Sequence, residues 1–295
     1  MRIGAKVPNS GPLPTQLGIP TMARTLERAG CTSLWVSDHV VLPRTIGSRY
    51  PFAANGKATW ETATPYVDAV VALSLIAAAT ETATFGPAVL VLPLRQPVVL
   101  AKQAASLDAV SGGRLRLGIG AGWLSEEFDA LGVPFASRGA RFTEWIELLR
   151  ACWTGTPPAH EGAHYTLPAD VLCLPVPAHE IPLLVGGHSP VALGRAGRLG
   201  NGWLAQQSLD ALDPAELAAG VQAVRAAAVG AGRDPEATSV VLRVVDTAGR
   251  SEQLARELGA LSAAGVDEVV VDVSWQDGGD PAGEIARLRD AADRR

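Results

Sequence analysis

The sequence predicts an α/β protein built as a (β/α)8 TIM barrel, with insertions after its second and fourth strands. Eight short apolar runs alternate with segments whose apolar residues recur at helical spacing, an order typical of parallel strands joined by crossover helices. The apolar runs lack polar alternation, which indicates strands covered on both faces. A chain of 295 residues suits a barrel of roughly 250 residues plus insertions, so we expect residues 1–295 to form a single domain.

The first half of the chain shows the repeating unit most clearly. An apolar run at residues 84–92 is followed by a helical segment at 98–110, which ends at Ser111-Gly112-Gly113 before the next apolar run at 114–120. Residues 40–65, after the second strand, lack periodicity and hold several aromatic residues, so we interpret them as a functional loop. The other elements predicted here are strands at 2–7 and 33–36 and helices at 18–29 and 67–80.

The second half of the chain continues the alternation. Ser189-Pro190 begins a helix with a serine cap and a proline in the first turn, and this helix ends near Gly200. Residues 154–180 are rich in proline, contain a possible hairpin arm at 164–173, and form an excursion from the barrel. The other elements predicted here are helices at 138–153, 214–229, 251–264 and 281–292 and strands at 182–185, 202–205, 239–245 and 268–273.

Composition excludes several classes of function. The net charge of -5, without any run of basic residues, argues against nucleic acid or an anionic membrane surface as a partner. Cys31, Cys152 and Cys173 show no CxxC spacing, so we expect neither a disulfide framework nor a zinc site, and a reducing cytoplasm fits best. The start MRIGAKVPNS resembles a buried strand more than a signal peptide, and no apolar stretch is long enough to predict a membrane span.

The C-terminal ends of the strands carry the active site in barrels of this kind. His39 directly follows the second strand, and Asp38 beside it could orient one of its ring nitrogens for proton transfer. A histidine hydrogen-bonded to the loop backbone explains the same position equally well. The five histidines show no HxH or HExxH spacing, and no acidic cluster ends the strands, so we expect no metal site.

Two glycine-rich segments also end predicted strands. The segment 118–122, GIGAG, resembles a dinucleotide fingerprint only superficially, because its last glycine comes one position early and it lies outside the first βα unit. A helix with Glu126 and Glu127 in its first turn follows this segment. Gly186-Gly187 precedes the capped helix and offers backbone N–H groups to a phosphate, although a tight turn alone would also need such a pair.

These segments together resemble the luciferase-like monooxygenase superfamily, whose members are flavin- or deazaflavin-dependent (β/α)8 barrels. The similarity extends over nearly the whole chain, and the chain is most similar to the branch assigned to the deazaflavin coenzyme F420. The residues that carry the resemblance lie in the segments 37–39, 86–97, 107–114, 118–128 and 186–203.

The resemblance assigns roles to residues at the strand ends. His39 matches a histidine beside the reactive edge of the cofactor ring, with Asp38 next to it as a second catalytic residue. Ala88-Val89 matches a non-prolyl cis peptide that forms a bulge behind the ring. The other cofactor-binding positions that it implies are Gly120, Ala121 and Gly122 at the ring pocket and Gly186, Gly187, His188 and Ser189 at the phosphate of the cofactor tail.

The chain departs from the sugar-phosphate dehydrogenases of the superfamily at two positions. Trp123 stands where those enzymes carry a glutamate acid, and Ala121 replaces a threonine. The proton-transfer role of that glutamate is therefore unassigned, and we expect a substrate other than that sugar phosphate. Trp123, together with Trp60 of the 40–65 loop, is expected to bind substrate, although a tryptophan at the edge of the core would look the same in sequence.

We therefore expect an F420-dependent oxidoreductase that transfers a hydride between C5 of the deazaflavin and a small organic substrate. His39 would be the proton donor or acceptor beside the ring, and the 40–65 loop would close the substrate site. The alternative is an FMN-dependent monooxygenase, which uses O2 and reduced flavin from a partner reductase. A third interpretation is a flavin-binding or storage protein that has no catalytic activity.

The resemblance also suggests a homodimer. The helices after the second and third strands, with Leu73, Leu75 and Ile76 among their apolar residues, are the expected interface. The same residues could instead cover the barrel, which is the ordinary role of a barrel helix.

Overall fold

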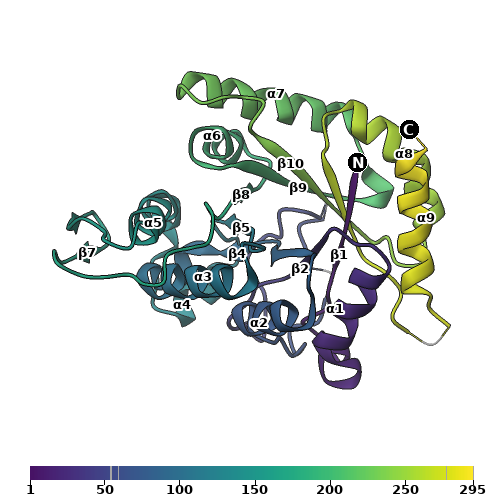
Figure 1. Cartoon of the computed structure of the whole chain (residues 1–295), viewed down its shortest axis with the longest axis horizontal. Helices are drawn as coiled ribbons and strands as arrows, with labels where there is room; N and C mark the ends of the chain where they lie inside the picture. The colour runs from purple at the N-terminus through teal and green to yellow at the C-terminus, as the bar shows by residue number, and fades with distance from the viewer. Residues whose placement is uncertain (54, 59, 277, 295) are drawn as a thin grey trace.

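The computed structural model describes residues 1–53, 55–58, 60–276 and 278–294 and contains the predicted parallel barrel (Figure 1). Its sheet has the strand order β3-β2-β1-β11-β10-β9-β8-β5-β4, and all neighbouring strands run parallel. The strands are β1 (Arg2–Lys6), β2 (Ser33–Val36), β3 (Thr84–Pro87), β4 (Leu90–Val91), β5 (Leu117–Gly120), β8 (Leu183–Gly186), β9 (Gly202–Ser208), β10 (Ser239–Val245) and β11 (Glu268–Val271).

β3 and β4 are the two halves of the strand predicted over residues 84–92. β3 pairs with β2 and β4 pairs with β5, while a parallel bridge between Phe85 and Leu115 joins the remaining edges and closes the barrel. A non-prolyl cis peptide at Ala88-Val89 separates the two halves, at the position that the resemblance implies. The prediction of one continuous strand was wrong in this detail, because the bulge interrupts the pairing.

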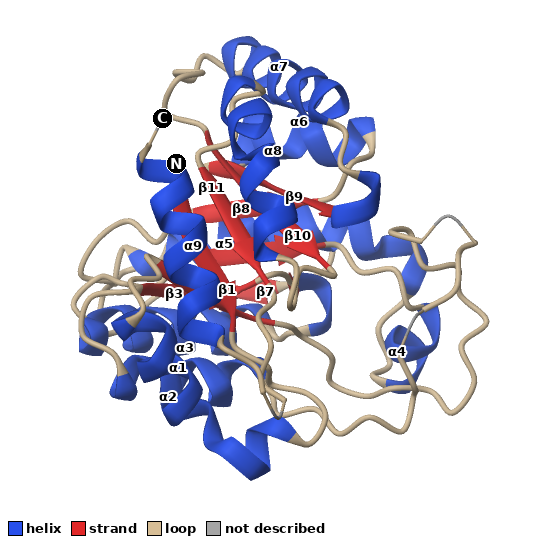
Figure 2. Ribbon diagram, turned by 90° about the vertical axis from the view of Figure 1, so that its right-hand side faces the viewer, coloured by secondary structure: helices blue, strands red, loops and turns tan. Residues whose placement is uncertain are grey.

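Helices surround the barrel on its outer side (Figures 1 and 2). Several begin at polar caps that are visible in the sequence: Asp68 accepts hydrogen bonds from the N–H groups of Val70 and Val71, and Ser189 accepts one from Ala192. The helices are α1 (Ile19–Arg28), α2 (Ala69–Ala79), α3 (Pro97–Ser111), α4 (Ser125–Ala130), α5 (Arg138–Trp153), α6 (Pro190–Leu199), α7 (Pro214–Gly230), α8 (Ser251–Ala263) and α9 (Pro281–Asp293).

Both predicted insertions are present, and the second one differs in detail. Its hairpin pairs β6 (His160–Glu161) with β7 (Thr166–Leu167), so the predicted arm at 164–173 is wrong beyond residue 167. Proline at 168, 175 and 177 removes backbone donors, which explains why the strand stops early. Within the barrel, β9 extends to Ser208, three residues past its predicted end.

Side chains at alternate strand positions fill the barrel interior. Five of them, buried and packed together, form its apolar middle: Trp35, Leu184, Leu204, Val241 and Val270. Ala88 and Val89 of the bulge pack onto this cluster from the C-terminal side and stay half-buried. The opposite strand faces pack against the helices in a larger apolar layer.

Only some of the residues predicted for the dimer interface lie on the surface. Leu73 and Ile76 are 1% and 0% exposed and pack against the barrel, so the expectation that they form an interface is wrong for these two. Leu75 and Val71 of the same helix are 40% and 54% exposed and remain on the surface. Across the described ranges, no helix is both long and apolar enough to cross a membrane.

Candidate active site

The insertion after β2 and helix α4 lie at the C-terminal ends of the strands, where the sequence predicts the site. Figure 2 shows the loops that gather around α4 on one side of the barrel. Tyr50 of the insertion reaches across to β9, where its Oη lies 3.4 Å from Nε2 of Gln206. Residues 54 and 59 of the predicted 40–65 loop lie outside the described residues.

His39 is held in place by a buried carboxylate from α4. Its Nδ1 lies 2.9 Å from Oε2 of Glu127, a residue that is 88 positions later in the chain and 1% exposed. The other oxygen of Glu127 accepts hydrogen bonds from the N–H groups of Val40 and Val41, at 2.6 and 3.2 Å. Glu127 therefore fixes both the imidazole and the backbone that follows it, and Nε2 of His39 has no hydrogen-bond partner in the described chain.

Asp38 faces away from His39. Its carboxylate accepts a hydrogen bond from the N–H of Val91 at 2.9 Å and pairs with the guanidinium of Arg95, which also binds Asp68 at 2.7 Å. The prediction that Asp38 orients the imidazole of His39 is therefore wrong, because Glu127 makes that contact. Asp38 instead joins the end of β2 to β4 and so positions the bulge.

Glu126, the neighbour of Glu127, fixes a second point of the same loop. Its carboxylate accepts hydrogen bonds from the N–H groups of Gly47 and Ser48, at 2.6 and 2.9 Å, and from Oγ of Ser48 at 2.7 Å. Desolvation raises the pKa of Glu126, but these hydrogen bonds outweigh it and lower the pKa to about 2. Glu127 and Glu126 thus attach the 40–65 loop to α4 at two points, residues 40–41 and residues 47–48.

Aromatic rings surround His39 on three sides. The imidazole centroid lies 5.5 Å from the ring of Tyr66, 6.1 Å from Trp60 and 6.4 Å from Trp123. Tyr50 contacts both tryptophans, with centroids 5.1 Å from Trp60 and 5.0 Å from Trp123. The structure therefore brings the two predicted substrate-binding tryptophans together beside His39, and their contact with substrate stays a prediction.

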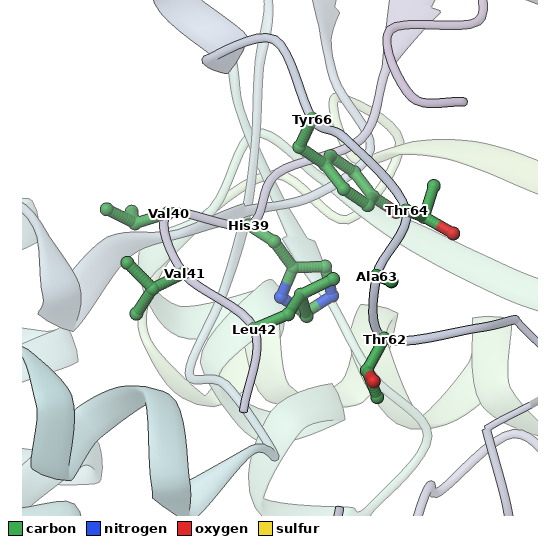
Figure 3. A pocket seen from close by; sticks show the side chains of 8 residues that line it. All are labelled: His39, Val40, Val41, Leu42, Thr62, Ala63, Thr64 and Tyr66. Carbon is green, nitrogen blue, oxygen red and sulfur yellow. The ribbon is translucent and has the colours of Figure 1, made fainter. Parts of the chain in front are cut away.

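A pocket of about 190 Å³ opens on the outer side of this cluster, with His39 in its wall (Figure 3). The imidazole lies between the backbone that follows it and the returning segment before Tyr66. The lining residues are His39, Val40, Val41, Leu42, Thr62, Ala63, Thr64 and Tyr66.

Gly120 and Gly186 make room for the bulge. A Cβ atom added to Gly120 would lie 2.7 Å from a methyl of Val89, and one added to Gly186 would lie 2.8 Å from the other methyl. Both distances are too short for carbon atoms, so these two predicted cofactor positions also have a packing role. The outer surface of Ala88-Val89 stays half-buried and is free to support a flat group.

Ala121 and Gly122 continue from β5 into the mouth and are half-buried. Gly122 has a φ of 84°, and a Cβ atom there would lie 2.6 Å from the ring of Phe128. The glycine is therefore needed for the turn into α4, which places Glu127 under His39. Contact of either residue with a cofactor stays a prediction.

The segment before α6 is built for its predicted turn. Gly187 has a φ of 117°, and its carbonyl accepts a hydrogen bond from Nε1 of Trp203 at 2.8 Å. Ser189 caps the helix through Oγ, which accepts from the N–H of Ala192 at 3.2 Å. The positive end of the α6 dipole points to the C-terminal rim of the barrel, as a phosphate site requires.

His188 differs from the other predicted cofactor residues because the protein uses both of its ring nitrogens. Nε2 accepts a hydrogen bond from the N–H of Gln206 at 3.0 Å, so the proton is on Nδ1, which donates to Glu216 at 3.2 Å. The ring is therefore occupied within the protein, and only the His188 backbone is left for a ligand.

Sequence reasoning missed Glu127, Glu126 and Tyr50. The two glutamates were visible at the start of a predicted helix, but there they indicated only a favourable helix dipole. Tyr50 was one of several aromatic residues in a loop without periodicity. The available signal for a partner of His39 was Glu127 itself, a carboxylate on α4 shortly after the glycine-rich end of β5.

The described part of the chain contains no group of three or more His, Cys, Asp or Glu side chains that could hold a metal ion.

Residues 9–294 match the model of the luciferase-like monooxygenase family. The chain belongs to this family. The match covers nearly the whole barrel and confirms the resemblance that the strand-end residues carry.

Curated relatives support the same assignment with different coverage. An uncharacterized protein of Mycobacterium tuberculosis is 37% identical over 183 residues, which are 62% of this chain and 63% of that relative. A second one from that organism is 27% identical over 276 residues, 90% of each chain. An F420-dependent glucose-6-phosphate dehydrogenase of Beutenbergia cavernae is 34% identical over 182 residues, 60% of this chain and 49% of the enzyme. The alignment thus spans about half of that dehydrogenase and less than two thirds of the first relative.

Solved structures confirm the barrel. An F420-dependent secondary alcohol dehydrogenase in complex with an F420-acetone adduct superimposes with a TM-score of 0.78 at 17% identity, covering 99% of this chain and 98% of that one. The coenzyme F420-dependent tetrahydromethanopterin reductase of Methanopyrus kandleri gives 0.74 at 19% identity, covering 100% and 99%. Monooxygenase RslO1 of Streptomyces bottropensis gives 0.72 at 20% identity, covering 99% and 98%. At these identities the likeness establishes the fold.

Proposed function

We propose that the protein is an F420-dependent oxidoreductase that transfers a hydride between C5 of the deazaflavin and a small organic substrate. One observation carries the proposal: Nδ1 of His39 is fixed by the buried Glu127, while Nε2 has no protein partner. A histidine held in this way can donate or accept a proton through Nε2 without turning. It stands at the mouth of the barrel among rings that exclude water.

The residues at the mouth fit a flat cofactor with a phosphate. The half-buried surface of Ala88-Val89 would support the ring, and the α6 N-terminus after Gly186-Gly187 would receive the phosphate. When bound, F420 supplies hydride exchange at C5. The chain supplies the support behind the ring, the proton at His39 and the aromatic cover of the loop.

One further observation favours F420 over FMN. Relatives and structural neighbours include several enzymes named as F420-dependent.

The substrate is expected to differ from glucose 6-phosphate. Trp123 and Ala121 stand at the positions where the sugar-phosphate dehydrogenases carry an acid and a threonine, and the Trp123 ring packs against Tyr50 and Trp60. The wall beside His39 is therefore aromatic, and it suits a substrate with an apolar body.

The cofactor is tested by titrating the purified protein with F420 and, separately, with FMN, while cofactor fluorescence is followed. We expect F420 to bind at least about 10-fold more tightly, a difference of about 1.4 kcal/mol. Preference for FMN would overturn the proposal and turn the search to O2-dependent substrates and a partner reductase. Binding of neither would leave the fold without its proposed cofactor.

The role of His39 is tested with His39→Ala and the matched control His179→Ala, which changes an exposed histidine outside the mouth. With the substrate found in a screen of the F420-loaded protein, His39→Ala should lower kcat by about 10²- to 10⁴-fold, the range for a lost general acid or base. His179→Ala should match the unchanged protein, and both should bind F420 normally. Equal activity of the two variants would favour a cofactor-binding protein whose His39 is not catalytic.

A further inference from the structure

Three charged side chains from neighbouring strands meet inside the barrel at the floor of its C-terminal mouth. Lys6 ends β1, and the register of β1 against β11, Ala5 opposite Val271, places Lys6 beside Asp272. Arg243 of β10 faces the same interior two residues lower, opposite Val270. Lys6 shares the inward face of β1 with Gly4, because a Cβ atom on Gly4 would meet side chains of the barrel interior. The chain has two other lysines, Lys57 and Lys102.

Positive charge exceeds negative charge in this group. Arg243 donates to Oδ1 of Asp272 at 2.5 Å and to the carbonyl of Val244 at 2.8 Å, so the carboxylate is already used. The ammonium of Lys6 has no hydrogen bond and no ion pair within 4 Å in the described residues, and its nearest charged neighbours are Arg243 and Asp272. Burial and the charge of Arg243 lower the pKa of Lys6 to about 8, so the lysine still carries its charge at pH 7.

The unpaired ammonium of Lys6 needs an explanation, because a desolvated charge without a partner destabilises the fold. Lys6 is half-buried, which means that solvent from the mouth reaches it. Asp272 beside it already accepts a hydrogen bond from Arg243, so the group of three keeps one net positive charge.

The aromatic cluster of the active site ends directly above this floor. Gln206 pairs with Arg243 in the β9–β10 register, and its side chain contacts Oη of Tyr50 at 3.4 Å. Tyr50 in turn packs against Trp123, whose ring lies 6.4 Å from that of His39. A chain of side-chain contacts therefore leads from the proton-transfer group His39 through the aromatic rings to Gln206, which lies beside Arg243 at the level of the charged floor.

We propose that Lys6, supported by Arg243, binds an oxyanion of the substrate, so that the enzyme acts on small organic acids with an apolar body. The carboxylate would contact the ammonium at the floor, the apolar body would lie against the aromatic wall, and the reacting carbon would lie toward His39. This assignment of the anion to a substrate rests on the proposed function. The binding site itself can be tested without turnover.

The test titrates the protein with benzoate and with its neutral analogue benzamide while tryptophan fluorescence is followed, since Trp60 and Trp123 line the mouth. We expect benzoate to bind about 10-fold more tightly than benzamide, as a charge-assisted contact predicts. Lys6→Met should remove this preference by weakening benzoate alone about 10-fold, and Lys6→Arg should retain it. Lys102→Met, which removes an exposed lysine on α3, should behave like the unchanged protein.

Equal affinity for benzoate and benzamide in the unchanged protein, or a preference that survives Lys6→Met, would overturn the proposal. A thermal midpoint at or above that of the unchanged protein shows that Lys6→Met is folded, and Lys6→Arg provides an independent variant. Repeating the benzoate titration at saturating F420 distinguishes a substrate site from a cofactor site. Benzoate that still binds supports a substrate site, whereas displacement by F420, with F420 weakened by Lys6→Met, would assign the cation to the cofactor and overturn the substrate claim.

The outcomes also separate this proposal from the proposed function. A protein that binds no F420 but shows a benzoate preference that depends on Lys6 would keep the oxyanion site and lose the cofactor assignment. A protein that binds F420 but ignores the charge of the probe would keep the proposed function and lose the oxyanion site.

Discussion

Each end of the barrel interior contains an ion pair between an arginine and a carboxylate, but the two pairs differ in their surroundings. At the N-terminal end, Glu268 is 0% exposed and binds Arg116 at 2.7 Å and the hydroxyl of Ser33. The guanidinium of Arg116 also lies over the ring of Trp35, 5.1 Å from its centroid, and Trp35 donates to Ser33 at 2.7 Å. The carboxylate of Glu268 is thus paired with both a guanidinium and a hydroxyl in this buried plug.

At the C-terminal end, Arg243 and Asp272 form a similar ion pair, but Lys6 is added without a partner. The side chain of Asp272 is 28% exposed, against 0% for Glu268. The N-terminal cluster is thus enclosed and complete, while the C-terminal one is open and has a surplus charge. The difference indicates that the first cluster contributes stability and that the second is arranged for a ligand, which is where barrels of this type carry function.

The largest expected effect is on the free energy of unfolding, and it should differ between the two ion pairs. Glu268→Gln leaves Arg116 buried with a neutral partner, and we expect the free energy of unfolding to fall by roughly 3 to 5 kcal/mol. The matched change Asp272→Asn at the open end should cost less, because the Asp272 side chain is 28% exposed and gives up less solvation when it pairs. Urea unfolding followed by circular dichroism measures both. Equal losses, or a larger loss for Asp272→Asn, would contradict the division between a structural and an open end.

A second effect concerns Glu127, which at 1% exposure is nearly as enclosed as Glu268 but pairs with a histidine. We expect Glu127→Gln to lower kcat at least about 10-fold, about 1.4 kcal/mol of activation free energy, because His39 loses its orienting anion. The pH dependence of kcat should change as well, while F420 affinity stays the same. Glu126→Gln on the same helix is the matched control for loop attachment. A fall in kcat equal for both variants would assign Glu127 to the loop and not to His39.

A third effect is a pH dependence of stability that comes from Lys6. The pKa is about 8 in the folded protein and 10.5 ordinarily, so between these values the unfolded chain binds more protons than the folded one. Stability should therefore rise with pH across this interval, by at most about 1.4 kcal/mol per pH unit, relative to Lys6→Met. Urea unfolding of the two proteins at pH 7, 8.5 and 10 measures the difference, in which the titration of tyrosines and cysteines cancels. A constant difference would show that Lys6 is solvated like a surface lysine.

Much of the fold could be predicted because its signals are local. The caps at Asp68 and Ser189 and the glycines after residue 111 delimit helices within a few residues of sequence. The bulge at Ala88-Val89 was different, since no local pattern indicated it and only the family resemblance did. The hairpin arm failed beyond residue 167 because prolines in an irregular segment limit strand pairing, an effect that composition alone does not locate.

The candidate site was predicted less completely. His39 was found because it directly follows a strand, but its partner Glu127 lies 88 residues away on a short helix. Asp38 was its neighbour in sequence, yet adjacent residues at a strand end point in opposite directions, and Asp38 reaches Arg95 instead. Sequence adjacency was therefore a poor guide to which carboxylate meets the imidazole.

The sequence by itself determined the alternation of strands and helices and the position of His39 at a strand end, because periodicity, caps and strand ends are properties of short segments. Only the tertiary structure decided which distant charges meet. Lys6, Arg243 and Asp272 come from the two ends of the chain, and no pattern in the sequence connects them. Closure of the barrel places β1 between β2 and β11, and that pairing puts an unpaired cation at the floor of the mouth.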